Sequence, residues 1–160
     1  MKVQSRDEYY LDIARQVSKE SNCIRRQVGA VIVRESVVIA RACNGTPAGV
    51  KPCSEGGCLR CQSGAVSGQE YEACLCTHAE QKAIAVAAKE GVSTEGGVLY
   101  CTLRPCLTCA MTCLESGIRH ITYGDDILFA QDVEDAYRQL VVETGLVVAK
   151  LDSSDRLCPQ

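Results

Sequence analysis

Two short stretches decide the fold: residues 74–80, CLCTHAE, and residues 98–109, VLYCTLRPCLTC. The first leads into an alanine-rich run over 79–90, where apolar residues recur at helical spacing and Gly91 provides a stop. The second follows a predicted strand over 97–102 and continues, past Pro105, into a predicted helix over 106–116 that ends at Gly117. These patterns place a helix directly after each stretch and predict a layered α/β arrangement.

The remaining elements alternate in the same way on both sides of these stretches. Ser5 and Glu8 form a capping box before a predicted helix over 6–19. Further predicted elements are strands over 28–34 and 37–43, a strand over 118–123, a helix over 132–143 and a strand over 146–151. The order α-β-β-α-β-α-β-α-β predicts an α/β fold with a mixed five-stranded sheet and helices on both faces.

Length and composition limit the possible classes of protein. The chain has 160 residues, 46% of them hydrophobic and 23% charged, which suits a single domain over 1–160. The net charge of -3 leaves no broad basic face, so we expect no nucleic-acid partner. The apolar runs are too short to span a bilayer and the N-terminal residues lack the apolar core of a signal peptide, so we expect no membrane association and a cytoplasmic location.

Twelve cysteines require an explanation in a chain of this kind. In a cytosolic protein, clustered cysteines indicate metal binding or catalysis rather than a disulfide framework. Several crowd a Gly- and Ser-rich segment with little periodicity, and so long a loop needs an ordering element. We therefore predict a cysteine-rich, zinc-binding insertion at about residues 50–76.

His78, Glu80, Cys106 and Cys109 form the pattern H-x-E followed by P-C-x-x-C, which is typical of zinc deaminases. One imidazole and two thiolates provide three protein ligands and leave the fourth zinc position open for water. Cys106 and Cys109 share one face of a predicted helix N-terminus, where the helix dipole favours thiolates. Glu80 is placed beside this zinc as the proton shuttle between the attacking water, the ring nitrogen and the departing amine.

A closed structural zinc site, completed by one more cysteine, is the alternative interpretation of the same Cys₂His set. Such a site requires neither Glu80 nor placement at helix starts, and the sequence has both. A non-catalytic, zinc-stabilised binding module remains a second alternative.

Over about residues 10–148 the chain resembles the deoxycytidylate deaminase family of the cytidine deaminase-like superfamily. The segments that carry the resemblance are 21–33 (SNCIRRQVGAVIV), 44–47 (NGTP), 56–61 (GGCLRC), 74–80 and 99–109. The resemblance implies a three-layer α/β/α sandwich that deaminates dCMP to dUMP and so feeds dTMP synthesis. It also implies a homo-hexamer, activation by dCTP and inhibition by dTTP. The zinc pattern alone fits a tRNA adenosine deaminase or a free-base or nucleoside deaminase as well, although the acidic balance disfavours the tRNA enzyme.

The resemblance also assigns roles to residues around the zinc pattern. Asn44 would contact the deoxyribose, while Ala79 and Tyr123 would lie near the nucleotide. Lys89 falls where some members have an arginine implicated in phosphate or effector binding. Two departures from the family pattern, Cys43 in place of tyrosine and Lys82 in place of asparagine, bear on the effector response more than on the chemistry.

A second, structural zinc is expected in the insertion. Some family members bind one through residues equivalent to Cys23, Cys53 and Cys76, and the fourth ligand here could be Cys58, Cys61 or Cys74. Buried free thiols are the alternative, and two closely spaced zinc ions that share thiolates are a further possibility.

The other candidate residues have ordinary interpretations. Arg25 and Arg26 are either solvated charges before a strand or contacts to a nucleotide phosphate. Cys101 and Cys113 are predicted core residues, His120 an ordinary surface or core histidine, and Cys158 a cysteine without a role.

Overall fold

The computed structural model describes residues 4–66 and 71–151. The helices are α1 (Arg6–Ser18), α2 (Leu59–Gln62), α3 (Ala79–Lys89), α4 (Leu107–Glu115) and α5 (Gln131–Thr144). The strands are β1 (Gly29–Arg34), β2 (Val37–Cys43), β3 (Val98–Leu103), β4 (His120–Asp125) and β5 (Val147–Lys150). Two 3₁₀ turns, η1 (Cys53–Glu55) and η2 (Tyr71–Ala73), flank α2.

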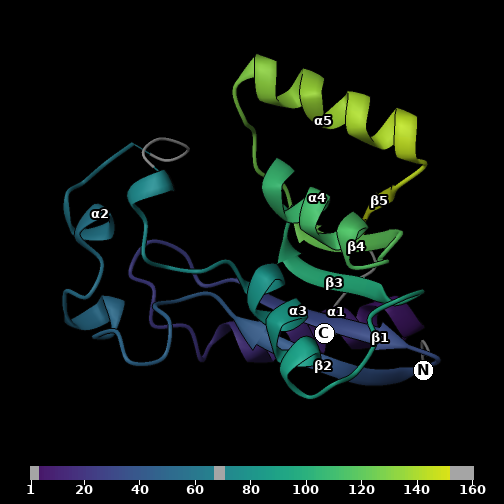
Figure 1. The fold of residues 1–160 in the computed structure, drawn as a ribbon, viewed down its shortest axis with the longest axis horizontal. Helices are drawn as coiled ribbons and strands as arrows, with labels where there is room; N and C mark the ends of the chain where they lie inside the picture. The colour runs from purple at the N-terminus through teal and green to yellow at the C-terminus, as the bar shows by residue number, and fades with distance from the viewer. Residues whose placement is uncertain (1–3, 67–70, 152–160) are drawn as a thin grey trace, which may run out of the picture.

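The five strands form one mixed sheet in the order β2-β1-β3-β4-β5 (Figure 1). β1 pairs antiparallel with both β2 and β3, whereas β3, β4 and β5 run parallel. Because of these directions, the first residues of β1 lie beside the last residues of β2 and β3, at one end of the strands. The sequence prediction of a mixed five-stranded sheet is confirmed.

One face of the sheet packs against α1. The helix begins at the predicted capping box, in which Glu8 N–H donates to Ser5 Oγ and Ser5 N–H donates to the Glu8 carboxylate. Its buried face meets alternate residues of β1 and β3; the cluster consists of Tyr10, Leu11, Ala14, Val31, Val33 and Tyr100. Gly29 lies against this helix so closely that a Cβ would overlap the Ala14 carbonyl oxygen.

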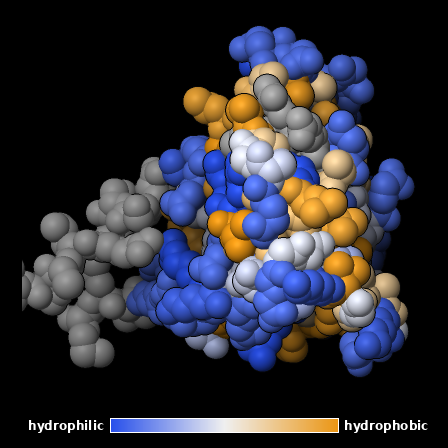
Figure 2. All heavy atoms as spheres, turned by 90° about the vertical axis from the view of Figure 1, so that its left-hand side faces the viewer, coloured by the Kyte–Doolittle hydropathy of each residue, from blue (hydrophilic) through white to orange (hydrophobic). Residues whose placement is uncertain are grey.

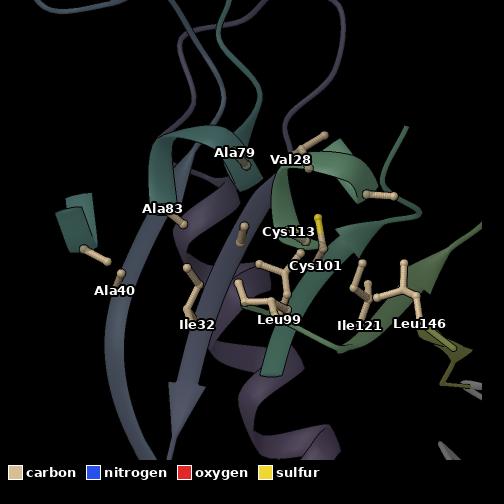
Figure 3. Packing of buried hydrophobic residues seen from close by; sticks show 14 of the residues in the cluster. Val28, Ile32, Ala40, Ala79, Ala83, Leu99, Cys101, Cys113, Ile121 and Leu146 are labelled. Atoms are coloured by element: carbon tan, nitrogen blue, oxygen red, sulfur yellow. The ribbon is translucent and has the colours of Figure 1, made fainter. Parts of the chain in front are cut away.

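The opposite face packs against α3, α4 and α5 and holds the larger core (Figure 3). Ile32 of β1 and Leu99 of β3 point into it, as strand alternation requires. Cys101 of β3 and Cys113 of α4 lie on facing elements in this core and are fully buried, which confirms their prediction as core residues. Helices on both faces give the three layers that the resemblance implied.

The main differences from the sequence prediction concern ends of elements. β4 begins at His120 rather than at residue 118, because Ile118 is still part of the turn after α4 and its N–H donates to the Cys113 carbonyl. α4 begins at Leu107, and Cys106 is its N-cap residue. His120 is exposed, which agrees with its interpretation as an ordinary residue. Cys158 lies outside the described residues.

The predicted loop between β2 and α3 forms a separate lobe on the left of Figure 1. We call it the cysteine lobe and define it as residues 47–66 and 71–77 together with Cys23, which packs against them. It is not wholly irregular, since it contains η1, α2 and η2. Figure 2 views the molecule from this side and shows hydrophilic residues interspersed with hydrophobic ones. Among the described residues, no helix is both long enough and apolar enough to cross a membrane.

Candidate active site

Three potential metal ligands converge where α3 and α4 begin. His78 is the N-cap residue of α3 and Cys106 is the N-cap residue of α4, with Cys109 one turn further along. His78 Nδ1 lies 3.3 Å from Cys109 Sγ and 3.5 Å from Cys106 Sγ. All three donor atoms lie within 4.8 Å of one another.

These separations fit a tetrahedral zinc ion. Zinc–nitrogen bonds of about 2.0–2.1 Å and zinc–sulfur bonds of about 2.3 Å place N and S about 3.6 Å apart in a tetrahedron. The donor set is one borderline nitrogen and two soft sulfurs, the combination that zinc prefers. The residues present therefore fit the zinc implied by the sequence pattern, with three protein ligands and one open position.

The surroundings of Cys106 favour the thiolate form, which is the form that binds a metal. Hydrogen bonds from Cys109 and from His78 lower the pKa of Cys106 to about 4. The same pairing, together with burial, raises the pKa of Cys109. Because Cys106 caps the N-terminus of α4 and Cys109 lies in its first turn, the helix dipole also stabilises negative charge there. A cation between the two sulfurs would bring both to the thiolate form.

Glu80 lies in the first turn of α3, two residues after His78, and is 4% exposed. Burial raises the pKa of its carboxyl group, and a hydrogen bond with the Cys101 side chain below it opposes part of that rise. A carboxyl group with a raised pKa can accept a proton and return it near neutral pH. Glu80 is therefore suited to proton transfer at the edge of the three-ligand site.

A cavity of about 280 Å³ opens above these residues. His78, Glu80 and Cys106 form part of its lining, as do Asn44 and the fully buried Ala79. The rest of the lining includes four arginines, four cysteines of the cysteine lobe and several apolar side chains: Arg25, Arg26, Arg60, Arg104, Cys23, Cys61, Cys74, Cys76, Val28, Leu103, Ile127 and Phe129. Because Arg104 pairs with Glu134, the positive character of the cavity comes from Arg25, Arg26 and Arg60, and it suits an anionic ligand.

Asn44 is fixed by three hydrogen bonds within the protein. Its Oδ1 accepts from Ser21 Oγ at 2.7 Å and from Val28 N–H at 2.8 Å. Its Nδ2 donates to the Arg26 carbonyl at 2.8 Å. An amide nitrogen has two hydrogens, so this geometry leaves one donor for a ligand in the cavity.

Two residues predicted from the resemblance do not line this cavity. Lys89 is exposed in the last turn of α3, at the opposite end of the helix from His78. Tyr123 is buried in β4, and its hydroxyl donates to Asp126 at 3.0 Å. Lys82 donates to the Thr46 carbonyl at 3.2 Å and so contacts the turn after Asn44.

Arg104 is a cavity residue that the sequence reasoning missed. Its guanidinium makes two hydrogen bonds to Glu134, at 3.0 and 2.7 Å, and lies 4.5 Å from the ring centre of Tyr137. This pairing raises the pKa of Arg104 and lowers that of Glu134. The sequence signal for Arg104 was its position two residues before Cys106. Its partner Glu134 is 30 residues further along the chain and could not be predicted from that position.

The cysteine lobe provides two further groups of potential ligands. Cys23, Cys53, Cys61 and Cys76 form one, and Cys58, Cys61, Cys74 and Cys76 form the other, each with all sulfurs within 4.8 Å. The structure thus brings together every cysteine considered for the second zinc. It places Cys61 beside the three residues that the resemblance had named.

A mixed sheet covered by helices, with an imidazole, two thiols and a buried carboxyl at two helix N-termini, defines the class of zinc-dependent deaminases. Within that class, the chain belongs to the family described as the cytidine and deoxycytidylate deaminase zinc-binding region, whose model matches residues 4–125. Zinc is accordingly the cofactor for which the donor set is built.

Curated relatives support the same family. Deoxycytidylate deaminase of Schizosaccharomyces pombe is 44% identical over 117 residues, which cover 73% of this chain and 36% of that one. Deoxycytidylate deaminase of Mycobacterium phage D29 is 38% identical, with 73% of this chain and 92% of that one covered. The chain spans only 36–37% of the length of the two yeast relatives, from S. pombe and Saccharomyces cerevisiae.

Solved structures agree with the fold. The dCMP deaminase of cyanophage S-TIM5, crystallised in complex with dCMP and dUMP, is 29% identical with a TM-score of 0.73. The similarity covers 94% of this chain and 100% of that one. A tRNA:A34 deaminase structure at 22% identity shares the fold, with a TM-score of 0.60.

Proposed function

We propose that the chain catalyses the hydrolytic deamination of dCMP to dUMP and ammonia. The observation that carries the proposal is the buried Glu80 beside the His78, Cys106 and Cys109 donors, at the base of a cavity rich in arginine. The relatives named deoxycytidylate deaminase and the solved structure with dCMP and dUMP support the choice of substrate. In this assignment residues 1–160 form one deaminase domain with a zinc-binding insertion at about 50–76.

The zinc, when bound, supplies Lewis-acid activation of the attacking water. The chain's own contribution is proton transfer, which Glu80 performs: its carboxylate takes a proton from the attacking water and delivers it to N3 of the pyrimidine ring. A later transfer through the same carboxyl group protonates the departing amine, so that one water is consumed and one ammonia released. Burial of Glu80 excludes competing solvent and keeps its pKa raised for this exchange.

The cavity lining supports a nucleotide rather than an uncharged nucleoside. Arg25 and Arg26 are exposed at the cavity rim, where a 5′-phosphate can reach them, and Asn44 retains one amide hydrogen for the sugar. Guanidinium groups bind phosphate oxygens in a bidentate manner. We assign Arg25 and Arg26 to the phosphate, Asn44 and Ala79 to the nucleoside, and keep Tyr123 and Lys89 as candidates for indirect or effector contacts.

Further properties rest on the family resemblance. We propose a cytoplasmic homo-hexamer that contributes to dTMP synthesis, with dCTP as activator and dTTP as inhibitor. Lys82 stands where asparagine is usual in the family, and its contact with the Thr46 carbonyl places a positive charge next to Asn44. The response to dCTP and dTTP is therefore the property to measure for this position. We also propose that the cysteine lobe binds structural zinc, in addition to the zinc of the catalytic site.

Glu80→Gln tests the mechanism. The amide keeps the shape of the side chain but cannot accept and return a proton, so ammonia release from dCMP should fall by about 10²–10⁴-fold. Zinc bound to the His78 site should remain at the wild-type level, because Glu80 is not a ligand. A variant that keeps most of the wild-type rate would overturn the assigned role.

A further inference from the structure

The buried cluster of the cysteine lobe contains sulfur and no aliphatic side chain. Its members are Cys23, Cys53, Cys58, Cys61 and Cys76, with Cys74 packed against them. All six are free thiols in the structure. Six small side chains bury too little apolar surface to order a segment of this length, whereas metal–thiolate bonds can do so.

The sulfur atoms form two groups of four, and within each group all sulfurs lie within 4.8 Å of one another. Tetrahedral zinc with bonds of about 2.3 Å places its sulfurs about 3.8 Å apart. Cys58 and Cys74 are separated by 3.8 Å, and Cys61 lies 3.9 Å from both Cys74 and Cys76. These are the edges of tetrahedra that zinc would occupy.

The two sites share an edge. Cys61 and Cys76 belong to both groups, Cys23 and Cys53 to the first alone. Cys58 and Cys74 belong to the second alone. From this juxtaposition we propose that the cysteine lobe holds a binuclear zinc centre, Zn₂Cys₆, in which the Cys61 and Cys76 thiolates bridge two ions.

A single zinc ion explains the arrangement less well. It would use the first group and leave Cys58 and Cys74 without a ligand role. Yet Cys58 is fully buried, and its sulfur lies 3.8 Å from that of Cys74, the separation expected for two ligands of one zinc ion. Cys61 would then have a second set of sulfur neighbours for no structural reason. The binuclear centre uses all six thiols.

Zinc binding here needs no oxidant or reductant, but it leaves a negatively charged centre. Six thiols release six protons as two Zn²⁺ ions bind, which leaves a centre with two negative charges and no change of oxidation state. Arg60, only 7% exposed, lies in the same cavity wall as Cys61 and Cys76 and supplies positive charge nearby.

The centre has a consequence for the active site. Cys76 lies two residues before His78, and Cys23, Cys61, Cys74 and Cys76 all line the catalytic cavity. Two metal ions that tie the segments around Cys23, Cys53–Cys61 and Cys74–Cys76 together would fix one wall of that cavity. The proposal does not depend on the deaminase assignment, because the His78 site and the cysteine lobe have no ligand in common.

Native mass spectrometry of the zinc-replete full chain tests the proposal. We expect three zinc ions per wild-type chain, one at the His78 site and two in the cysteine lobe. The double variant Cys58→Ser, Cys74→Ser should lose one ion, and Cys43→Ser, a half-buried cysteine outside both groups, should lose none. Two ions in the wild type and an unchanged count in the double variant would overturn the binuclear assignment.

Cobalt substitution of the wild-type chain tests bridging without any variant. Two cobalt(II) ions joined by the Cys61 and Cys76 thiolates should show coupled spins, with a magnetic moment per ion below that of isolated tetrahedral cobalt(II). Fully uncoupled spins in a chain that binds three ions would show that the two lobe sites are separate and would overturn the proposed bridge.

Discussion

Replacement of Glu134 by glutamine should destabilise the fold through Arg104. The Arg104 side chain is 13% exposed and the Glu134 side chain 21%, and two hydrogen bonds of 3.0 and 2.7 Å join them. Glu134 also accepts a hydrogen bond from Phe129 N–H at 3.1 Å. In the Glu134→Gln variant the amide nitrogen faces an Arg104 donor, so one charge-assisted bond is lost and the ionic attraction disappears.

The expected loss in the free energy of unfolding is about 2–3 kcal/mol, the usual contribution of a hydrogen bond between charged groups plus the penalty of a half-buried unpaired charge. A fully buried pair would lose about 3–5 kcal/mol, but solvent still reaches this one. For a chain of this size the melting temperature should fall by roughly 4–12 °C. Urea and thermal unfolding at fixed protein and zinc concentrations measure the change.

Asp135→Asn is the matched control. Asp135 is the next residue on α5 and pairs with Arg138, but both side chains are more than half exposed. Exposed pairs of this kind contribute little to stability, so Asp135→Asn should leave the free energy of unfolding nearly unchanged. Equal effects of Glu134→Gln and Asp135→Asn would refute the reasoning, because burial of the Arg104–Glu134 pair would then have no energetic consequence.

The sign of the pH dependence follows from the same pair. The Arg104 guanidinium lowers the pKa of Glu134 below its ordinary value of 4.5. A carboxyl group with a depressed pKa in the folded state stabilises the fold above its unfolded pKa and loses that contribution as pH falls through the folded pKa. The stability difference between wild type and Glu134→Gln should therefore be largest near neutral pH and shrink below pH 4.5.

Three other perturbations have defined outcomes. Asn44→Ala should lower the free energy of unfolding by about 3–5 kcal/mol, because three hydrogen bonds are lost and Val28 N–H is left buried without its partner. Urea unfolding measures this change, and a loss below about 1 kcal/mol would contradict the prediction. Gly29→Ala should cost about 2 kcal/mol or more, since its Cβ would overlap the backbone of α1, and a wild-type melting temperature would be the opposite result. Removal of zinc by a chelator should make residues 53–62 the first site that a protease cleaves. Mass spectrometry of the fragments locates the cleavage, and a first cleavage within α5 instead would show that metal does not order the cysteine lobe.

The sequence was enough for the parts of the molecule that local patterns control. The capping box at Ser5, the β-branched strands and the glycine stops predicted the five strands and the four longer helices to within two residues, but not η1, α2 or η2. The pairing of His78 with Cys106 and Cys109 followed from spacing, because each motif starts a helix and the metal chemistry requires the two helix ends to meet.

Contacts between distant segments could not be predicted in this way. Arg104 reaches Glu134 across 30 residues, and only the packing of α5 beside α4 brings the two together. The Asn44 side chain was assigned to the ligand, but folding also uses it to hold the segment before β1. The ligand set in the cysteine lobe stayed open because the spacing of six cysteines does not determine which sulfurs share a metal.

The measurement that tests the central claim most directly is ammonia release by the zinc-replete chain from dCMP, compared with deoxycytidine, CMP, cytosine and an adenosine-containing tRNA stem-loop. The account predicts efficient turnover of dCMP and much weaker turnover of deoxycytidine, with the gap reduced in an Arg25→Ala, Arg26→Ala variant. Turnover of another substrate in preference to dCMP would contradict the substrate assignment, and no turnover of any of them would contradict the deaminase function itself.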